Sequence, residues 1–172
     1  SPNGRDLIKR VRENIGIAIE LISGAEEARL IYLGVLSGMS LENKSHIILD
    51  IGGGSTELIL ANSKDTRALT SSRIGAVRLK KDFFQDEPLT NSRLDFIKTF
   101  IQGSLEPSIG KIKRRLDKNE SISMIATSGT AIALGNLISS DLGEPKQKMH
   151  GYKFEKSNLE ALLSKLIKLT PF

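Results

Sequence analysis

The chain has 172 residues, of which 39% are hydrophobic and 26% are charged, and these values predict a soluble globular protein of one domain, or of one domain and part of another. No apolar run approaches the roughly 20 residues that a membrane helix requires, and basic residues near the start interrupt any stretch that could act as a signal peptide. The chain has no cysteine, which excludes disulfides and thiolate chemistry and agrees with the cytoplasmic location that we expect.

The balance of charge favours an anionic partner. The formal net charge is +5, and nucleic acid, phosphorylated metabolites and polyphosphate would all be attracted to such a protein. Aromatic residues make up only 5% of the chain and Trp is absent, so few side chains could stack on unpaired bases. We therefore expect no specific nucleic-acid partner and no membrane association.

The chain opens with a predicted helix and a predicted strand. Asn3 can cap a helix that carries Leu7 and Ile15 on one face, and Gly16 would end it. The apolar run 17–22 then predicts a strand. A single strand cannot bury its face and no other strand precedes this one, so the unit is typical of the end of a larger domain.

Residues 23–38 predict the next helix, because Ser23 and Glu26 have the spacing of a capping box. That pairing gives Glu26 a structural role. Glu27 lies in the same first turn but points elsewhere by about 100°. On spacing alone, the simplest explanation of Glu27 is that its charge complements the helix dipole. Arg29 is expected at the surface or in a salt bridge.

The segment from Asp50 to Glu57, with the sequence DIGGGSTE, is the most informative part of the chain. Apolar runs at 46–49 and 58–61 have the length and β-branched content of core strands, so the segment predicts a turn between two strands. The turn contains three consecutive glycines, Gly52, Gly53 and Gly54. Glycines would let the backbone adopt φ > 0 and bring its amides to a ligand, and phosphate is the commonest guest of such a turn.

Two acids flank this turn. Asp50 and Glu57 would repel a bare phosphate, but they are suitable ligands if a hard cation such as Mg²⁺ lies between them and the phosphate oxygens. A P-loop is excluded because no Lys follows the last glycine, and a Rossmann fingerprint is excluded because no GxGxxG opens a helix. A plain hairpin is the alternative, although such a turn normally needs only two residues, such as Asn-Gly.

A third strand is predicted at 67–74, which would extend the hairpin into an antiparallel meander. Arg73 and Arg78, on either side of a glycine, could reach substrate phosphates or could simply be solvated. Apolar residues spaced three or four apart from 94 to 116 then predict a long amphipathic helix, which Pro107 should kink or divide.

The run 121–126 predicts a further strand, followed by small residues at 127–130 and a helix at 131–139. A strand, a turn of small residues and a helix N-terminus can together bind an anion. The alternative is an ordinary connection in which Ser128 or Thr130 caps the helix.

Four segments together resemble the exopolyphosphatase/guanosine pentaphosphatase (Ppx/GppA) family. They are LISGAEEARLIYLGV at 21–35, LDIGGGSTEL at 49–58, SRIGAVRL at 72–79 and ATSGT at 126–130. Their order and separations match, and the resemblance extends over nearly the whole chain. It implies an α/β fold of the actin-like (ribonuclease H-like) class, with a mixed sheet flanked by helices.

The resemblance also implies roles for particular residues. The acid that matches Glu27 is the general base toward the attacking water, which reverses the explanation favoured by spacing alone. The acids that match Asp50 and Glu57 hold a divalent metal, Mg²⁺ or another cation. The phosphate-binding residues implied are Gly52, Gly53, Gly54, Ser55, Thr56 and Gly129.

The activity implied is the release of terminal orthophosphate from inorganic polyphosphate, and a pppGpp (guanosine pentaphosphate) 5′-phosphohydrolase is the alternative that shares these motifs. A sensor that binds nucleotide or polyphosphate without turnover is an alternative of another class, and the intact Glu27 argues against it. The sequence leaves a homodimer open.

One departure from the family concerns the ends of the chain. The strand–turn–strand with an Asp-x-Gly-Ser-type phosphate loop that begins family members has no match here, and family chains continue past the last helix. We therefore predict that residues 1–25 are the closing helix and strand of a first actin-like domain, and that residues 26–172 form a second, C-terminally truncated domain. Without the first loop, we expect little or no activity from this chain alone.

Overall fold

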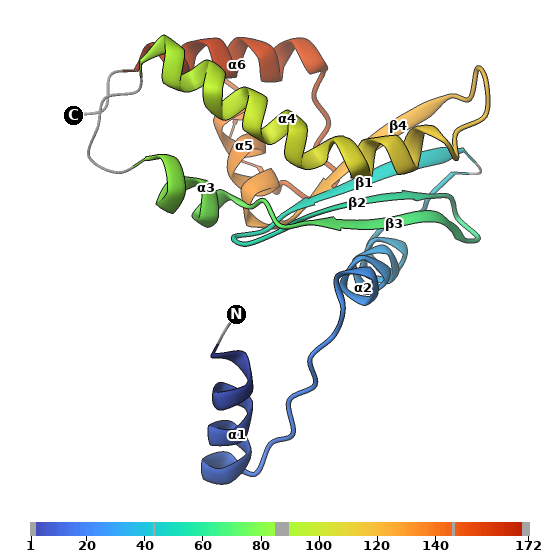
Figure 1. Cartoon of the computed structure of the whole chain (residues 1–172). Coiled ribbons are helices and arrows are strands. Elements are labelled where there is room, and N and C mark those ends of the chain that lie inside the picture. The colour runs from blue at the N-terminus through green and yellow to red at the C-terminus, as the bar shows by residue number, and fades with distance from the viewer. Residues whose placement is uncertain (1–2, 43, 85–89, 146, 170–172) are drawn as a thin grey trace.

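A computed structural model describes residues 3–42, 44–84, 90–145 and 147–169. Figure 1 shows the elements that these residues form. In chain order they are α1 (Gly4–Ile15), α2 (Gly24–Gly38), β1 (Ser45–Ile51), β2 (Thr56–Ala61), β3 (Thr66–Ser72), α3 (Ala76–Phe83), α4 (Asn91–Lys113), β4 (Ile122–Thr127), α5 (Ser128–Asp141) and α6 (Lys156–Lys168). None of the described helices combines the length and the apolar content needed to cross a membrane.

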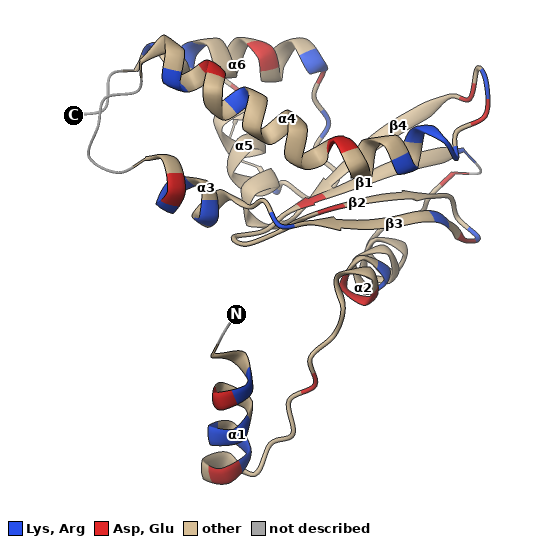
Figure 2. Ribbon diagram, in the orientation of Figure 1, with Lys and Arg blue, Asp and Glu red and all other residues tan. Residues whose placement is uncertain are grey.

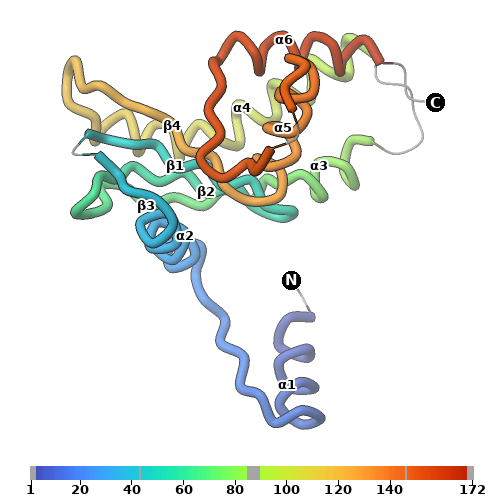
Figure 3. The backbone as a smooth tube through the Cα atoms, turned by 180° about the vertical axis from the view of Figure 1, so that it is seen from behind, coloured from blue at the N-terminus to red at the C-terminus, as the bar shows by residue number. Residues whose placement is uncertain are grey.

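The four strands form one mixed sheet in the order β3-β2-β1-β4. β2 is antiparallel to both β1 and β3, and β4 pairs with β1 in parallel. α2 lies on one side of the sheet, and α4, α5 and α6 lie on the other (Figures 1 and 3). The predicted class, an α/β fold with a mixed sheet flanked by helices, is confirmed.

β2 runs through the centre of the core and is buried at all six of its positions. Ile59 faces α2 and belongs to the same cluster as Tyr32 of that helix. Leu58 and Leu60 face the opposite side, in a cluster with Ile112 of α4. Successive side chains of a strand point to opposite faces, so a strand covered on both faces needs apolar residues at consecutive positions.

The predicted strand at 17–22 is absent from the structure. These residues form an extended connection with exposed side chains, and no described residue of α1 is buried. Figures 1 and 3 show α1 and this connection standing apart from the remaining elements. A strand needs a hydrogen-bonded neighbour, and none of the described strands pairs with this segment. Asn3 occupies the N-cap of α1 but does not form the predicted side-chain hydrogen bond.

Two helices differ from the sequence-based expectation. α3 begins at Ala76, where no helix is predicted. α4 is a single helix that contains Pro107, so of the two predicted effects, a kink or a division, the division is wrong. Proline removes one amide donor, but beyond it α4 remains attached to the sheet. Ser108 forms a 2.8 Å hydrogen bond with Ser72 of β3, and Ile112 is buried.

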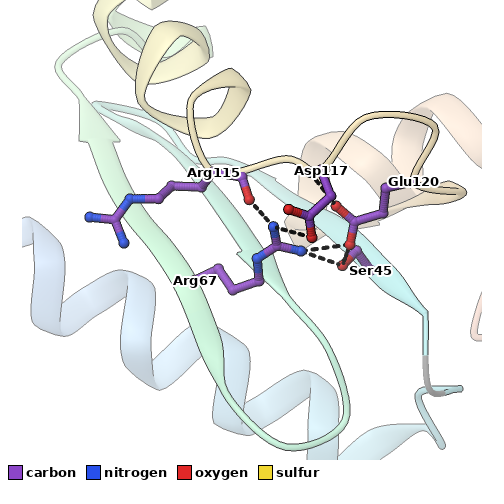
Figure 4. Close-up of polar contacts among 5 residues, drawn as sticks. All are labelled: Ser45, Arg67, Arg115, Asp117 and Glu120. Atoms are coloured by element: carbon purple, nitrogen blue, oxygen red, sulfur yellow. Dashed lines mark hydrogen bonds and ion pairs between the residues drawn. The ribbon is translucent and has the colours of Figure 1, made fainter.

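A polar cluster joins β1, β3 and the loop before β4 at the start of β1 (Figure 4). Arg67 of β3 donates hydrogen bonds to Glu120 at 2.6 Å and to Ser45 at 3.2 Å. It also donates to the backbone carbonyl of Arg115. Hydrogen bonds from Ser45 and from the amide of Asp117 hold the pKa of Glu120 below its ordinary value. The members bond to one another, so the cluster is a structural clasp at the end of the sheet opposite the glycine turn.

Candidate active site

A row of polar side chains crosses the sheet near the glycine turn. Asp50 of β1 pairs with Glu57 of β2 and with Thr127 of β4. Glu57 in turn pairs with Ser71 of β3. Residues directly opposite one another on paired strands share a face, and this row shares the face that carries Ile59 and α2. Figure 2 colours acidic positions red, and red segments occur within β1 and β2, the strands that carry these acids.

Hydroxyl groups hold both acids in place. Thr127 Oγ1 donates to Asp50 Oδ2 at 2.6 Å, and Ser71 Oγ donates to Glu57 Oε1 at 2.7 Å. Sequence reasoning missed both hydroxyls as partners of the acids. The strand register of the predicted meander could have identified Ser71 as a partner, because it places Ser71 directly opposite Glu57.

The environment of Glu57 is unfavourable to a bare charge. Its side chain is buried, with a relative exposure of 1%. Burial raises the pKa of Glu57, hydrogen bonds from Ser71 and Ser55 lower it, and the charges of Glu27 and Asp50 raise it again, so that the pKa lies above its ordinary value. The structure therefore brings the three predicted acids into one electrostatic neighbourhood.

The first turn of α2 presents Glu27 to solvent. Ser23 accepts a 3.2 Å hydrogen bond from the amide of Glu26, which confirms the serine half of the predicted capping box but not the reciprocal bond to the side chain of Glu26. The carboxylate of Glu26 forms an ion pair with Arg29, with hydrogen bonds of 2.7 and 2.8 Å, and this confirms the salt bridge expected for Arg29. Among the described residues, none forms a hydrogen bond or ion pair with the carboxylate of Glu27.

The start of α2 is anchored directly on the polar row. A Cβ atom placed on Gly24 would lie 2.6 Å from Ser71 Cβ and 2.7 Å from Ser71 Oγ, which is too close for any other residue. The same Ser71 hydroxyl bonds Glu57. Glycine at position 24 therefore lets the helix that carries Glu27 approach the strand next to the buried acid.

The glycine turn is open on one side. Gly53 and Gly54 are exposed, and within the part of the chain that the structure describes their amides have no hydrogen-bond partner. The amide of Gly52 donates to the Ser55 carbonyl at 3.0 Å and closes the turn. Thr56 is buried, and its hydroxyl donates to the Ile74 carbonyl at 2.6 Å, so this hydroxyl is committed to the fold.

The expectation that these three glycines adopt φ > 0 is wrong. Among the described glycines, only Gly16, Gly143 and Gly151 lie in the left-handed region. The turn is shaped instead by its contact with the start of α3. A Cβ atom on Gly53 would lie 3.2 Å from Val77 Cγ2, and one on Gly75 would lie 2.5 Å from the carbonyl carbon of Gly53.

The second loop binds the end of β1 rather than capping its own helix. Ser128 Oγ and Thr130 Oγ1 both donate to the Ile51 carbonyl, at 2.9 and 2.8 Å. α5 therefore begins with no side-chain cap, and the alternative that Ser128 or Thr130 caps it is wrong. Ser128 has φ of 74°, a conformation that costs energy for a non-glycine residue. Gly129 is exposed next to it.

The donor set suits Mg²⁺ with a bound phosphate better than an all-protein metal site. No cluster of three or more acids or histidines that could enclose a metal occurs among the described residues. Asp50 and Glu57 offer two carboxylates, and Mg²⁺ is usually bound by one or two carboxylates together with water and substrate phosphates. A cation would also relieve the repulsion that raises the pKa of Glu57. The residues therefore fit the predicted metal.

Comparison with known proteins gives a consistent picture. A model of the Ppx/GppA phosphatase family matches residues 1–172. A guanosine-5′-triphosphate,3′-diphosphate pyrophosphatase from Aliivibrio fischeri is 33% identical over 131 residues, which are 76% of this chain and 25% of that protein. The corresponding enzyme from Photobacterium profundum is 34% identical over 107 residues, 62% of this chain and 21% of that protein.

The fold is also similar to a solved structure. The crystal structure of an exopolyphosphatase from Cytophaga hutchinsonii ATCC 33406 matches with a TM-score of 0.83 and 27% identity, over 98% of this chain and 53% of that one. The chain thus spans about half the length of this structure and about a quarter or less of the two curated relatives.

Proposed function

Because the chain belongs to the Ppx/GppA phosphatase family, we propose that it carries part of an active site that releases terminal orthophosphate from inorganic polyphosphate. The observation that carries this proposal is the row of Asp50 and Glu57 beside the open glycine turn, with Glu27 in the same neighbourhood. Two buried or half-buried acids directly opposite each other destabilise a sheet, so their presence is better explained by a bound cation than by the fold.

In the proposed reaction, exposed amides of Gly53 and Gly54 bind the terminal phosphate, with further contacts from Ser55 and Gly129. Gly52, the other predicted glycine, shapes the turn instead, because its amide donates to the Ser55 carbonyl. Asp50 and Glu57 would hold Mg²⁺ or another divalent cation, which when bound neutralises phosphate charge. Phosphoryl transfer depends mainly on positioning and on charge neutralisation, and this set of groups contributes to both.

Glu27 is proposed as the general base. Its exposed carboxylate has no internal partner among the described residues, so it is free to accept a proton from water as the water attacks phosphorus. The bond from phosphorus to the bridging oxygen breaks, and the shortened polyphosphate leaves with that oxygen. Thr56 is not included in this proposal, because its hydroxyl donates to the Ile74 carbonyl.

A pppGpp 5′-phosphohydrolase is the second candidate. The names of the Aliivibrio and Photobacterium relatives favour it, whereas the name of the Cytophaga structure favours polyphosphate. Both substrates end in a phosphoanhydride that the same turn could bind. Phosphate release from each substrate, measured side by side with the same enzyme, distinguishes the two.

The whole protein is proposed to have two actin-like domains. Residues 1–25 would belong to the first and residues 26–172 to the second, so the substrate would be enclosed only when both are present. Two facts support this division: the chain covers 53% of the Cytophaga exopolyphosphatase, and α1 buries none of its described residues. The 172-residue chain by itself should release little or no phosphate.

The test is a substitution of Glu27 in a protein that contains both domains. Glu27→Gln should lower the rate of phosphate release by about 10²- to 10⁴-fold, the usual contribution of a general base, while Mg²⁺ binding remains. Glu26→Gln is the matched control, since it changes the neighbouring acid, which is paired with Arg29. A wild-type rate in Glu27→Gln would remove Glu27 from this role. Loss of turnover together with unchanged polyphosphate binding would exclude the non-catalytic sensor.

A further inference from the structure

The backbone carbonyls of residues 51–54 all accept hydrogen bonds from the starts of neighbouring helices. The Ile51 carbonyl accepts two hydroxyl groups of the second loop, as described above. The Gly52 carbonyl accepts the amide of Ala76 at 3.0 Å, and the Gly53 carbonyl accepts the amide of Arg78 at 3.0 Å. The Gly54 carbonyl accepts a hydrogen bond from Nε of the Arg78 side chain at 3.3 Å. Four consecutive carbonyls are thus held by the starts of α3 and α5.

This arrangement decides where the amides point. In a planar trans peptide, the carbonyl of one residue and the amide of the next point in opposite directions. Hydrogen bonds that hold the carbonyls of Gly52 and Gly53 toward α3 therefore turn the amides of Gly53 and Gly54 away from it. By the same geometry, the bond from Arg78 to the Gly54 carbonyl sets the direction of the Ser55 amide.

Arg78 is the one member of this set that acts through a side chain from α3. Its backbone amide and its Nε hold adjacent carbonyls, so one residue fixes two successive peptides. The backbone bond does not depend on the identity of the side chain. The Nε bond does, and it can be removed without altering the helix.

We propose that Arg78 is a positioning residue, whose Nε group holds the Gly54–Ser55 peptide so that the Ser55 amide faces the phosphate site. Because the site is the glycine turn, this role in ligand binding rests on the function proposed above. The alternative role for Arg78 is a purely electrostatic one, in which its positive charge attracts the substrate and the Nε bond is incidental.

Two neutral substitutions separate these roles. In Arg78→Gln, the Nε2 group lies the same number of bonds from Cα as the arginine Nε, so the hydrogen bond can be kept while the charge is lost. In Arg78→Met, the side chain has similar length but no donor. Lys80→Met is the control for loss of a positive charge on the same helix, because Lys80 is exposed on α3.

The first measurement needs no ligand. We expect the amide signal of Ser55 and the carbonyl ¹³C signal of Gly54, in NMR spectra of the labelled 172-residue chain, to remain at their wild-type positions in Arg78→Gln and Lys80→Met. In Arg78→Met both signals should move, while the melting temperatures of Arg78→Gln and Arg78→Met agree. Identical spectra for the Gln and Met variants would overturn the proposal.

The second measurement is a titration with inorganic tripolyphosphate, followed by the same amide signals. Arg78→Met should bind about two- to tenfold more weakly than Arg78→Gln, the usual effect of one hydrogen bond. Equal weakening in the two variants would indicate that only the charge matters, against the proposal. If the wild-type signals do not respond to tripolyphosphate, the phosphate-binding function fails, while the ligand-free spectra still decide whether Arg78 fixes the turn.

Discussion

Glu57 is the residue at which stability and the proposed function oppose each other. It is almost fully buried, it lies directly opposite Asp50, and its pKa is raised above the ordinary value by burial first and by neighbouring acids in addition. A carboxylate with a raised pKa favours the protonated form in the folded state. Its ionisation therefore destabilises the fold, and this effect is absent below the pKa of the unfolded chain, roughly 4.3.

Replacement of Glu57 by a neutral residue should therefore stabilise the fold when no metal is present. Without metal, Glu57→Gln should raise the melting temperature at pH 7, by on the order of 2–4 °C for each kcal/mol of relieved repulsion. The gain should shrink toward zero as the pH falls below about 4, because Glu57 is then protonated in both states. Thermal denaturation at pH 7 and pH 3.5 measures this difference.

The same variant tests the metal site. Added Mg²⁺ should raise the melting temperature of the wild-type chain and leave that of Glu57→Gln unchanged, since a ligand that binds only the folded state stabilises it. An equal Mg²⁺ response in both proteins would show that Glu57 is not a metal ligand. Glu42→Gln, a change of an exposed acid, is the matched control and should respond as the wild type does.

At the scale of elements, the short helix α3 supports the glycine turn. Its N-cap is Gly75, and the backbone atoms of Gly53 and Gly54 lie so close that a Cβ atom on Gly75 would be 2.5–2.6 Å from three of them. The contact is between backbone and backbone, so no side-chain movement can relieve it. The distance from α3 to the turn therefore depends on glycine at position 75.

Two substitutions of glycine by alanine should have opposite effects on the stability of the chain. Gly75→Ala should destabilise the chain by about 1–3 kcal/mol, the usual cost of overpacking, and should shift the NMR signals of Gly53 and Gly54. Gly34→Ala is the matched control, because Gly34 lies inside α2 and a Cβ atom added there would meet no atom within 4 Å. It should stabilise the chain by about 0.5–1 kcal/mol. A stable Gly75→Ala variant with unchanged glycine signals would contradict the close approach.

At the scale of the whole molecule, the chain divides into a packed part and a projecting part. The sheet, its covering helices and the clasp of Arg67 and Glu120 form the packed part. α1 and the connection at 16–23 project from it, and their apolar side chains, among them Ile17 and Leu21, are exposed. Surfaces of this kind are typical of segments that pack against another domain.

Removal of residues 1–22 should therefore have little effect on the packed part. We expect a chain that begins at Ser23 to melt within about 2 °C of the 172-residue chain, because no described residue of α1 is buried. Leu162→Ala is the contrasting change. Leu162 of α6 is 4% exposed, and its truncation should cost about 2–5 kcal/mol. A large drop in melting temperature on deletion would show that α1 packs against the remainder in solution.

The sequence by itself determined the strands of the meander, the helix with Glu27, the two acids and the glycine turn. These features follow from local patterns: runs of apolar residues for strands, a capping serine for a helix, and consecutive glycines for a turn. The pairing of Asp50 with Glu57 was not itself predicted, although it agrees with a turn between two strands, which places its flanking residues opposite each other.

Only the tertiary structure decided how the turn is held and which predicted residues it uses. The φ > 0 expectation failed because contacts with α3, not local backbone preference, shape the glycines. The prediction of a strand at 17–22 was wrong because a strand forms only when a neighbouring strand pairs with it, and none of the described strands does. The hydrogen bonds of Ser71, Thr127 and Arg78 to the turn and its acids join residues 14 to 77 positions apart, and no local pattern encodes such contacts.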